Sequence, residues 1–190
     1  LRGLGVPCKV LSSLPMERVC DTFTSQRAEE AFAAGKVVLF ACGSGLPFFS
    51  TDTAAALKAA ETHADVLLLA KNVDAVYSAD PNVAPDAERY SRLTYDEVIE
   101  RDLKATDLTA ITLCREQHIP ILVFAMKEKG NKLLKHNKAV IKIDSHLLEL
   151  INKCHAYIAC VWHKFIAFNR HYHISEFQAP SAKRERPKKL

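Results

Sequence analysis

The stretch CGSGLPFFSTDT, residues 42–53, combines residue types that can hold an anion. Gly43 and Gly45 allow the backbone to turn sharply where other residues would be strained. Ser44, Ser50 and Thr51 of the same stretch supply hydroxyls just before an alanine-rich helical pattern. Because the N-terminus of a helix presents free N–H groups and a positive dipole, this turn predicts a phosphate-binding loop.

Phe48 and Phe49 in this loop offer flat faces for a planar base. A simpler interpretation is equally consistent with the residues, because GSG before a helix is also typical of an ordinary strand-to-helix turn with an N-terminal cap. In that case the two phenylalanines would belong to the core. The loop by itself leaves both interpretations open.

Two further segments carry polar side chains after expected strands or before an expected helix. KNVDAVYSADPNVAPDAERY, residues 71–90, is a long polar loop with Tyr77 and Asp80, and loops of this length are usually functional. The alternative is a surface excursion turned by its prolines. In LKATDLTA, residues 103–110, Asp107 either carries chemistry or caps a helix.

The order of apolar runs and helical patterns predicts an α/β fold that positions these segments. Continuous apolar runs indicate buried strands of a parallel sheet, as in one half of a doubly wound or related open sheet. Strands are expected at 8–13, 37–42, 65–70, 119–125 and 140–143. Helices are expected from Ser25 to a stop at Gly35, over 52–63, after Thr94 with Glu97 as a capping box, and after Asp107. Open α/β sheets bind ligands beyond the carboxyl ends of their strands, so chemistry is expected in the loops there.

Charge and composition separate a neutral body from a basic tail. With 190 residues, 48% of them hydrophobic, the chain can bury one core of ordinary size. Residues 1–138 carry 17 basic and 18 acidic side chains, whereas residues 139–190 carry 9 and 4.

The scattered cysteines favour a reducing compartment, and no apolar run approaches the ~20 residues that cross a bilayer. Leu1 is not a start methionine and no signal pattern follows it, which indicates a fragment.

The tail invites two other chemistries. Cys154, His155, Cys160 and His163 are zinc-binding residue types, but their spacing is not that of a standard zinc site, so a packed or irregular terminal helix is preferred. The sequence AKRERPKKL, residues 182–190, could contact nucleic acid, although a solvated terminus is favoured. No metal site, nucleic-acid contact or membrane contact is therefore predicted.

Taken together and in order, the three segments resemble the bacterial-type uridylate kinases of the amino acid kinase family. In that family the first loop reads like GTGNPFFTTD, here GSGLPFFSTD at 43–52, and the second like VDGVYxADP, here VDAVYSADP at 73–81. The third reads LTYxEVxxxxLKVMDLTAxTLCRExxxPIxVFNMxxxGN, here LTYDEVIERDLKATDLTAITLCREQHIPILVFAMKEKGN at 93–131. The resemblance covers about residues 1–131. It implies an open, mainly parallel sheet sandwiched by helices, of which this chain would form the C-terminal part.

The resemblance also implies a reaction and the residues that serve it. The reaction is ATP-dependent phosphorylation of UMP to UDP in pyrimidine nucleotide biosynthesis, with Mg²⁺ bound through the nucleotide phosphates. The matching UMP loop is Ser44, Gly45, Leu46, Pro47, Phe48, Phe49, Ser50 and Thr51, with Thr51 at the phosphate end and Ser44 at the base end. The matching ATP-side residues are Lys71 or Asn72, Tyr77 and Asp80. Asp107 would organise the transferring groups by positioning and electrostatics.

Departures from the family pattern qualify this expectation. Leu46 replaces an asparagine in the base-binding loop, Ala75 a glycine and Ala125 an asparagine. Ala75 would be strained if its position requires a positive φ. The KxSGE phosphate loop and the GGGN turn with which these enzymes begin do not occur in the 190 residues. We therefore expect little or no kinase activity from this chain alone.

Three functions from different classes follow, in this order of preference. The first is a uridylate kinase represented by a truncated chain, and the second is a non-catalytic nucleotide-binding remnant or subunit that pairs with a full-length kinase. The third is a nucleic-acid-binding module that uses the basic tail, which nothing in residues 1–138 supports. The resemblance further implies a homo-oligomer, a hexamer in this family, and a cytoplasmic location, with a plastid as the alternative.

Overall fold

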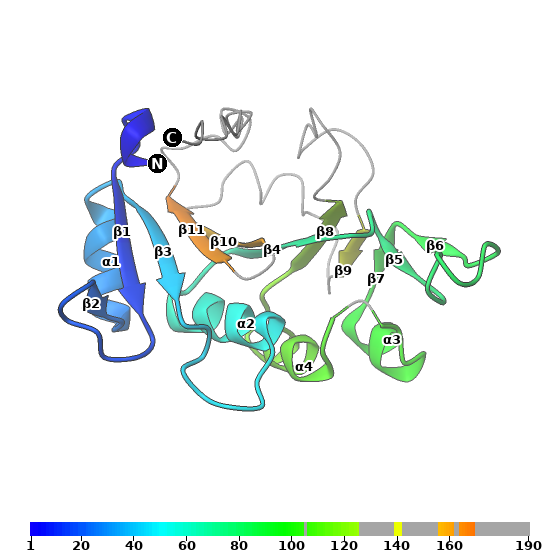
Figure 1. The fold of residues 1–190 in the computed structure, drawn as a ribbon. Coiled ribbons are helices and arrows are strands. Elements are labelled where there is room, and N and C mark those ends of the chain that lie inside the picture. Colours follow the sequence, from blue (N-terminus) through cyan, green and yellow to red (C-terminus); the bar gives the residue numbers. More distant parts are fainter. Residues whose placement is uncertain (105, 126–138, 142–155, 162–163, 170–190) are drawn as a thin grey trace, which may run out of the picture.

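The computed structural model describes residues 1–104, 106–125, 139–141, 156–161 and 164–169. Nine strands from these ranges form one sheet in the order β2-β1-β3-β11-β10-β4-β8-β9-β7, and β5 pairs with β6 beside it (Figure 1). The helices are η1 (Arg2–Leu4), α1 (Ser25–Ala33), α2 (Thr51–Glu61), α3 (Tyr95–Glu100) and α4 (Leu108–Glu116). The strands are β1 (Cys8–Ser12), β2 (Asp21–Thr22), β3 (Val37–Ala41), β4 (Val66–Lys71), β5 (Val76–Tyr77), β6 (Arg89–Tyr90), β7 (Arg92–Leu93), β8 (Ile121–Ala125), β9 (Ala139–Ile141), β10 (Ala156–Val161) and β11 (Lys164–Asn169).

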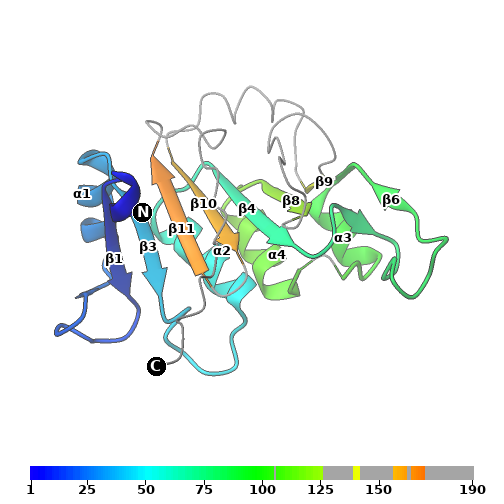
Figure 2. The same ribbon diagram turned by 45° about the horizontal axis from the view of Figure 1, so that its top comes forward.

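The predicted α/β fold with an open, mainly parallel sheet is confirmed. Strands β1, β3, β10, β4 and β8 run in one direction, while β11 runs against β3 and β10 and β9 runs against β8. β9 and β7 are parallel to each other. Helices α1, α2 and α4 lie on one face of the sheet, as Figure 2 shows. This follows from connections that advance across the sheet in one direction, because such crossovers are right-handed.

The core explains why the strands read as continuous apolar runs. On the helical face, alternate side chains such as Phe40, Leu67 and Leu69 pack with the alanines of α2. The residues between them in β4, Val66 and Leu68, are buried as well. Strands buried on both faces need apolar residues at every position, which the sequence supplies.

Local signals in the sequence set the helix boundaries. Thr94 and Glu97 form the predicted capping box of α3, with Thr94 Oγ1 accepting from the Glu97 N–H at 3.1 Å. Gly35 has φ +65° and follows the end of α1, as predicted. Helix α2 begins at Thr51, one residue earlier than predicted, because Ser50 caps it.

The tail contributes strands to the middle of the sheet. The predicted terminal helix is wrong over residues 156–161 and 164–169, where β10 and β11 form an antiparallel pair. β11 pairs with β3 and β10 with β4, so these two strands fill the sheet between β3 and β4 (Figure 1). Without the tail, the facing edges of β3 and β4 would leave backbone N–H and C=O groups unpaired. Pairing these groups stabilises strands in the tail more than its own sequence pattern favours a helix. The strand predicted at 140–143 is confirmed over residues 140–141 as part of β9, residues 142–143 lie outside the described residues, and the division at residue 138 stays a prediction.

Other predictions concern metals, cysteines and membranes. The side chains of Cys154, His155, Cys160 and His163 lie outside the described residues. Within the described ranges, no three His, Cys, Asp or Glu side chains are grouped as a metal site. Free thiols are present at Cys8, Cys20, Cys42 and Cys114. Among the described helices, none combines the length and the hydropathy needed to cross a bilayer.

Candidate functional site

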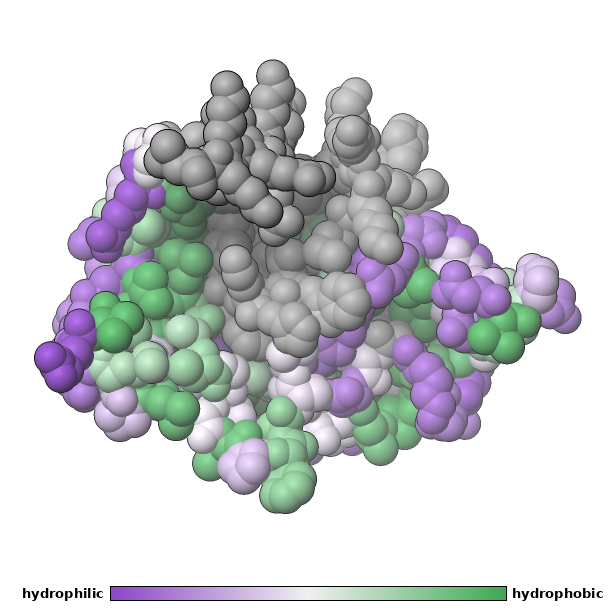
Figure 3. Space-filling view, in the orientation of Figure 1, coloured by the Kyte–Doolittle hydropathy of each residue, from purple (hydrophilic) through white to green (hydrophobic). Residues whose placement is uncertain are grey.

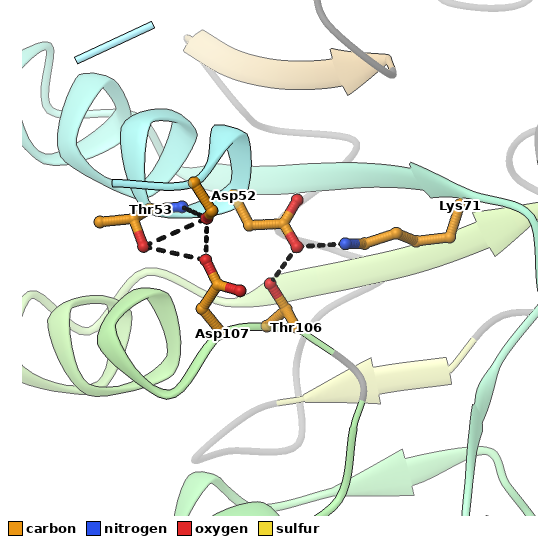
Figure 4. A network of polar contacts seen from close by, with 6 residues as sticks. Asp52, Thr53, Lys71, Thr106 and Asp107 are labelled. Carbon is orange, nitrogen blue, oxygen red and sulfur yellow. Dashed lines mark hydrogen bonds and ion pairs between the residues drawn. The ribbon is translucent and has the colours of Figure 1, made fainter. Parts of the chain in front are cut away.

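Asp107 lies at the N-cap position of α4, but its carboxylate does not cap that helix. Instead Oδ2 accepts a hydrogen bond from Thr53 Oγ1 at 3.0 Å and another from Ser50 Oγ. Ser50 Oγ at the same time accepts from the Thr53 N–H at 3.1 Å and so caps α2. The carboxylate therefore binds the first turn of α2 to the start of α4, 54 residues away along the chain from Thr53 (Figure 4).

A second carboxylate, Asp52, lies on the same turn of α2. Its Oδ2 accepts from Thr106 Oγ1 at 2.6 Å and forms an ion pair with Lys71 Nζ, at the end of β4. The Asp52 and Lys71 side chains are 14% and 26% exposed, so both groups are reachable but largely shielded from water. Figure 4 shows Asp52 and Asp107 side by side, the first facing Lys71 and Thr106. Two carboxylates and one ammonium thus meet at the carboxyl edge of the sheet.

The loop between β3 and α2 is held in an unusual backbone conformation. Gly43 and Gly45 have φ +58° and +77°, as expected of a sharp turn, and Cys42 and Phe48 also have positive φ. Ser13 Oγ donates to the Gly43 carbonyl at 2.7 Å. A Cβ on Gly45 would lie 3.1 Å from the Ser13 carbonyl oxygen, so the close approach of the two loops requires glycine there.

The aromatic residues of this loop face solvent. Phe48 is 105% exposed and Phe49 51%, so the alternative that they belong to the core is wrong. Leu46, in the position of the family's asparagine, is 61% exposed. Figure 3 shows hydrophobic side chains at the bottom of the molecule, where Figure 1 places this loop. Exposed apolar groups gathered beside a polar network are typical of a ligand-binding surface.

Other predicted residues of the UMP loop take local roles. Ser44 Oγ accepts from the Leu46 N–H at 3.1 Å, which fixes the turn. Thr51 is the first residue of α2 and is half-buried, while the cap itself is Ser50. Pro47 is exposed at the tip of the loop.

The residues predicted on the ATP side separate into two groups. Lys71 reaches the network through Asp52, whereas Asn72 is exposed, and the ATP contact of either residue stays a prediction. Tyr77 donates from Oη to Asp74 Oδ1 at 2.7 Å. Asp80 is exposed and accepts from the Asn82 N–H at 2.9 Å, which makes it part of its own turn. Ala75 is buried and is not among the residues with positive φ, so the backbone strain that a positive φ would cause at this alanine does not arise.

Sequence reasoning missed three members of the network. The helix expected over 52–63 gives Asp52 and Thr53 no chemical role, and within LKATDLTA only Asp107 is singled out, so Thr106 has none either. The usable signal was the polar run STDT at a helix start, because side chains there point toward whatever lies beyond the strand ends.

Comparison with known proteins accounts for this arrangement. The model of the amino acid kinase family matches residues 1–125. The chain belongs to the amino acid kinase family. It is 51% identical over 130 residues to the uridylate kinase of Paramagnetospirillum magneticum (strain ATCC 700264 / AMB-1), covering 68% of this chain and 54% of that protein. It is 46% identical over 133 residues to the uridylate kinase of Hyphomonas neptunium (strain ATCC 15444), covering 70% and 53%.

Solved structures of the amino acid kinase family agree with this fold. UMP kinase from Ureaplasma parvum superposes with a TM-score of 0.71 at 32% identity, covering 75% of this chain and 63% of that one. UMP kinase from Bacillus anthracis superposes with a TM-score of 0.69 at 29% identity, covering 74% and 60%. The chain spans about half the length of the curated relatives that it matches.

Proposed function

We propose that this chain takes part in ATP-dependent phosphorylation of UMP to UDP, a step of pyrimidine nucleotide biosynthesis. The observation that carries the proposal is the convergence of Asp107, at the start of α4, and Lys71, at the end of β4, on the first turn of α2 beside an exposed aromatic loop. Relatives named uridylate kinase at 46% and 51% identity support the choice of substrate.

The acceptor nucleotide would lie between the loop 43–51 and the start of α2. Phe48 and Phe49 present open faces to a base, and the helix dipole favours a phosphate at Thr51. Leu46 offers no side-chain hydrogen bond where the family has an asparagine, so the backbone groups of the loop would read the uracil.

Phosphoryl transfer needs positioning and charge stabilisation rather than covalent work by the protein. Lys71 would bring positive charge to the transferring phosphate, and Asp52 holds the Lys71 side chain in place. Asp107 fixes the relative position of α2 and α4, on which the distance between the two nucleotides depends.

Mg²⁺ would reach the site bound through the nucleotide phosphates, because in the described ranges no three His, Cys, Asp or Glu side chains are grouped to hold it. A bound ion would neutralise charge on the nucleotide phosphates, while Lys71 and the two carboxylates fix the surrounding polar groups.

A non-catalytic role is the second candidate, because the 190 residues contain no KxSGE loop and no GGGN turn. A phosphate cradle of N–H groups stabilises the transition state in such reactions, so we expect nucleotide binding by the purified chain with little turnover. Hexamer formation likewise stays a prediction, which light scattering of the purified chain would check.

Calorimetric titration of the purified chain with UMP and with ATP–Mg²⁺ tests the proposal, together with an assay of UDP formation. Lys71→Ala should weaken ATP binding, whereas the neighbouring exposed Asn72→Ala serves as the matched control and should not. UMP binding without turnover would favour the non-catalytic subunit. Failure of the wild-type chain to bind either nucleotide would rule out both candidates.

A further inference from the structure

A short ribbon follows β4 and carries the residues predicted on the donor side. β5 and β6 pair antiparallel, with Tyr77 directly opposite Arg89. Figure 1 shows this ribbon extending away from the main sheet, beyond β7. Its strands have two residues each, and so short a pair has little stability of its own in water. Something beyond backbone pairing must hold it.

One carboxylate bridges the two strands of the ribbon. Asp74, in the loop after β4, accepts from Tyr77 Oη at 2.7 Å through Oδ1 and from Arg89 Nε at 3.1 Å through Oδ2. The two partners are the facing pair of the ribbon, so each strand is attached to the same group. Asp74 lies three positions after Lys71, whose ammonium group belongs to the network at the start of α2.

The electrostatics favour this arrangement at neutral pH. Burial by itself would raise the pKa of Asp74, but the hydrogen bonds from Tyr77 and Arg89 outweigh it and hold that pKa below its usual range. The hydrogen bond to Asp74 raises the pKa of Tyr77, so the phenol keeps the proton that it donates. The partly exposed ion pair between Arg89 and Asp74 contributes little stability alone. The hydrogen bond from Tyr77 to the same carboxylate fixes the orientation of that contact.

We propose that Asp74 is a positioning residue for the donor nucleotide, because it fixes the ribbon of residues 76–90 to the end of β4 through Tyr77 and Arg89. The inference rests on the proposed function and on the resemblance, which implies that Tyr77 and Asp80 of this ribbon contact ATP. With Asp74 in place, the ribbon keeps one orientation relative to Lys71. Without Asp74, part of the free energy of ATP binding would be used to order the ribbon of residues 76–90.

Two measurements on the full chain test this role. Calorimetry gives the dissociation constants of ATP–Mg²⁺ and of UMP, and hydrogen exchange follows the Ser78 and Glu88 amides, which pair within the ribbon. Arg89→Ala should weaken ATP binding by about three- to tenfold, the effect of one lost hydrogen bond to a charged group, and speed exchange of both amides. UMP affinity should stay unchanged. Arg89→Lys should recover part of the ATP affinity.

Arg92→Ala, on the exposed surface of β7, is the matched control and should alter neither measurement. Binding of ATP by Arg89→Ala as tightly as by the wild type would overturn the inference, as would an equal loss of ATP and UMP affinity. A wild-type chain that binds neither nucleotide would overturn the proposed function and the donor role with it. The two failures differ in whether the wild type binds ATP.

Discussion

Replacement of Asp107 by alanine tests the central contact of the site. The carboxylate accepts from Thr53, which is 7% exposed, and from Ser50, which is exposed. A hydrogen bond to a charged acceptor contributes about 1.5–3 kcal/mol, and a carboxylate at a helix N-terminus adds about 0.3–1 kcal/mol. Water replaces most of the lost bond at Ser50. We therefore expect Asp107→Ala to lower the free energy of unfolding by about 2–4 kcal/mol.

Urea unfolding followed by circular dichroism measures this change, and a melting temperature lower by roughly 5–15 °C should accompany it. Asp107→Asn retains an acceptor and should lose about half as much. Asp96→Ala is the matched control, because Asp96 is exposed and pairs with Arg115 on the surface. Equal unfolding midpoints for Asp107→Ala and Asp96→Ala would refute the claim that Asp107 binds α2 to α4.

Three further outcomes are expected. Gly45→Ala should lower the free energy of unfolding by about 1–3 kcal/mol, since φ is +77° and the new Cβ would contact Ser13, just after β1. Gly43→Ala should be less destabilising, because its Cβ would meet nothing closer than 3.9 Å. Thermal melts of the two variants compare these effects. Deletion of residues 139–190 removes the hairpin between β3 and β4 and should abolish cooperative unfolding, and an unchanged urea midpoint would contradict this. Iodoacetamide should label exposed Cys42 and spare Cys114, because burial raises the pKa of the Cys114 thiol to about 12; mass spectrometry of the peptides decides.

Much of the fold could be predicted because its signals are local. The capping box at Thr94, the stop at Gly35 and the apolar runs of β4 and β8 each depend on residues a few positions apart. The sharp turn in the loop 43–51 could be predicted as well, since Gly43 and Gly45 permit the positive φ that the turn adopts, while its role in binding stays a prediction. The strands of the tail could not be predicted, because they form by pairing with the edges of β3 and β4, which are distant in the sequence.

By itself, the sequence determined the α/β class and the order of the main strands and helices from β1 to β8. Tertiary structure alone decided which side chains meet. Asp52 could equally have been a surface residue of α2, until the end of β4 brought Lys71 to it and the start of α4 brought Thr106. Asp107 could have capped its own helix, but the nearby first turn of α2 offers two hydroxyl donors. The partners of each carboxylate depend on which donors the folded chain places within hydrogen-bond distance. No pattern of neighbouring residues in the sequence encodes that distance.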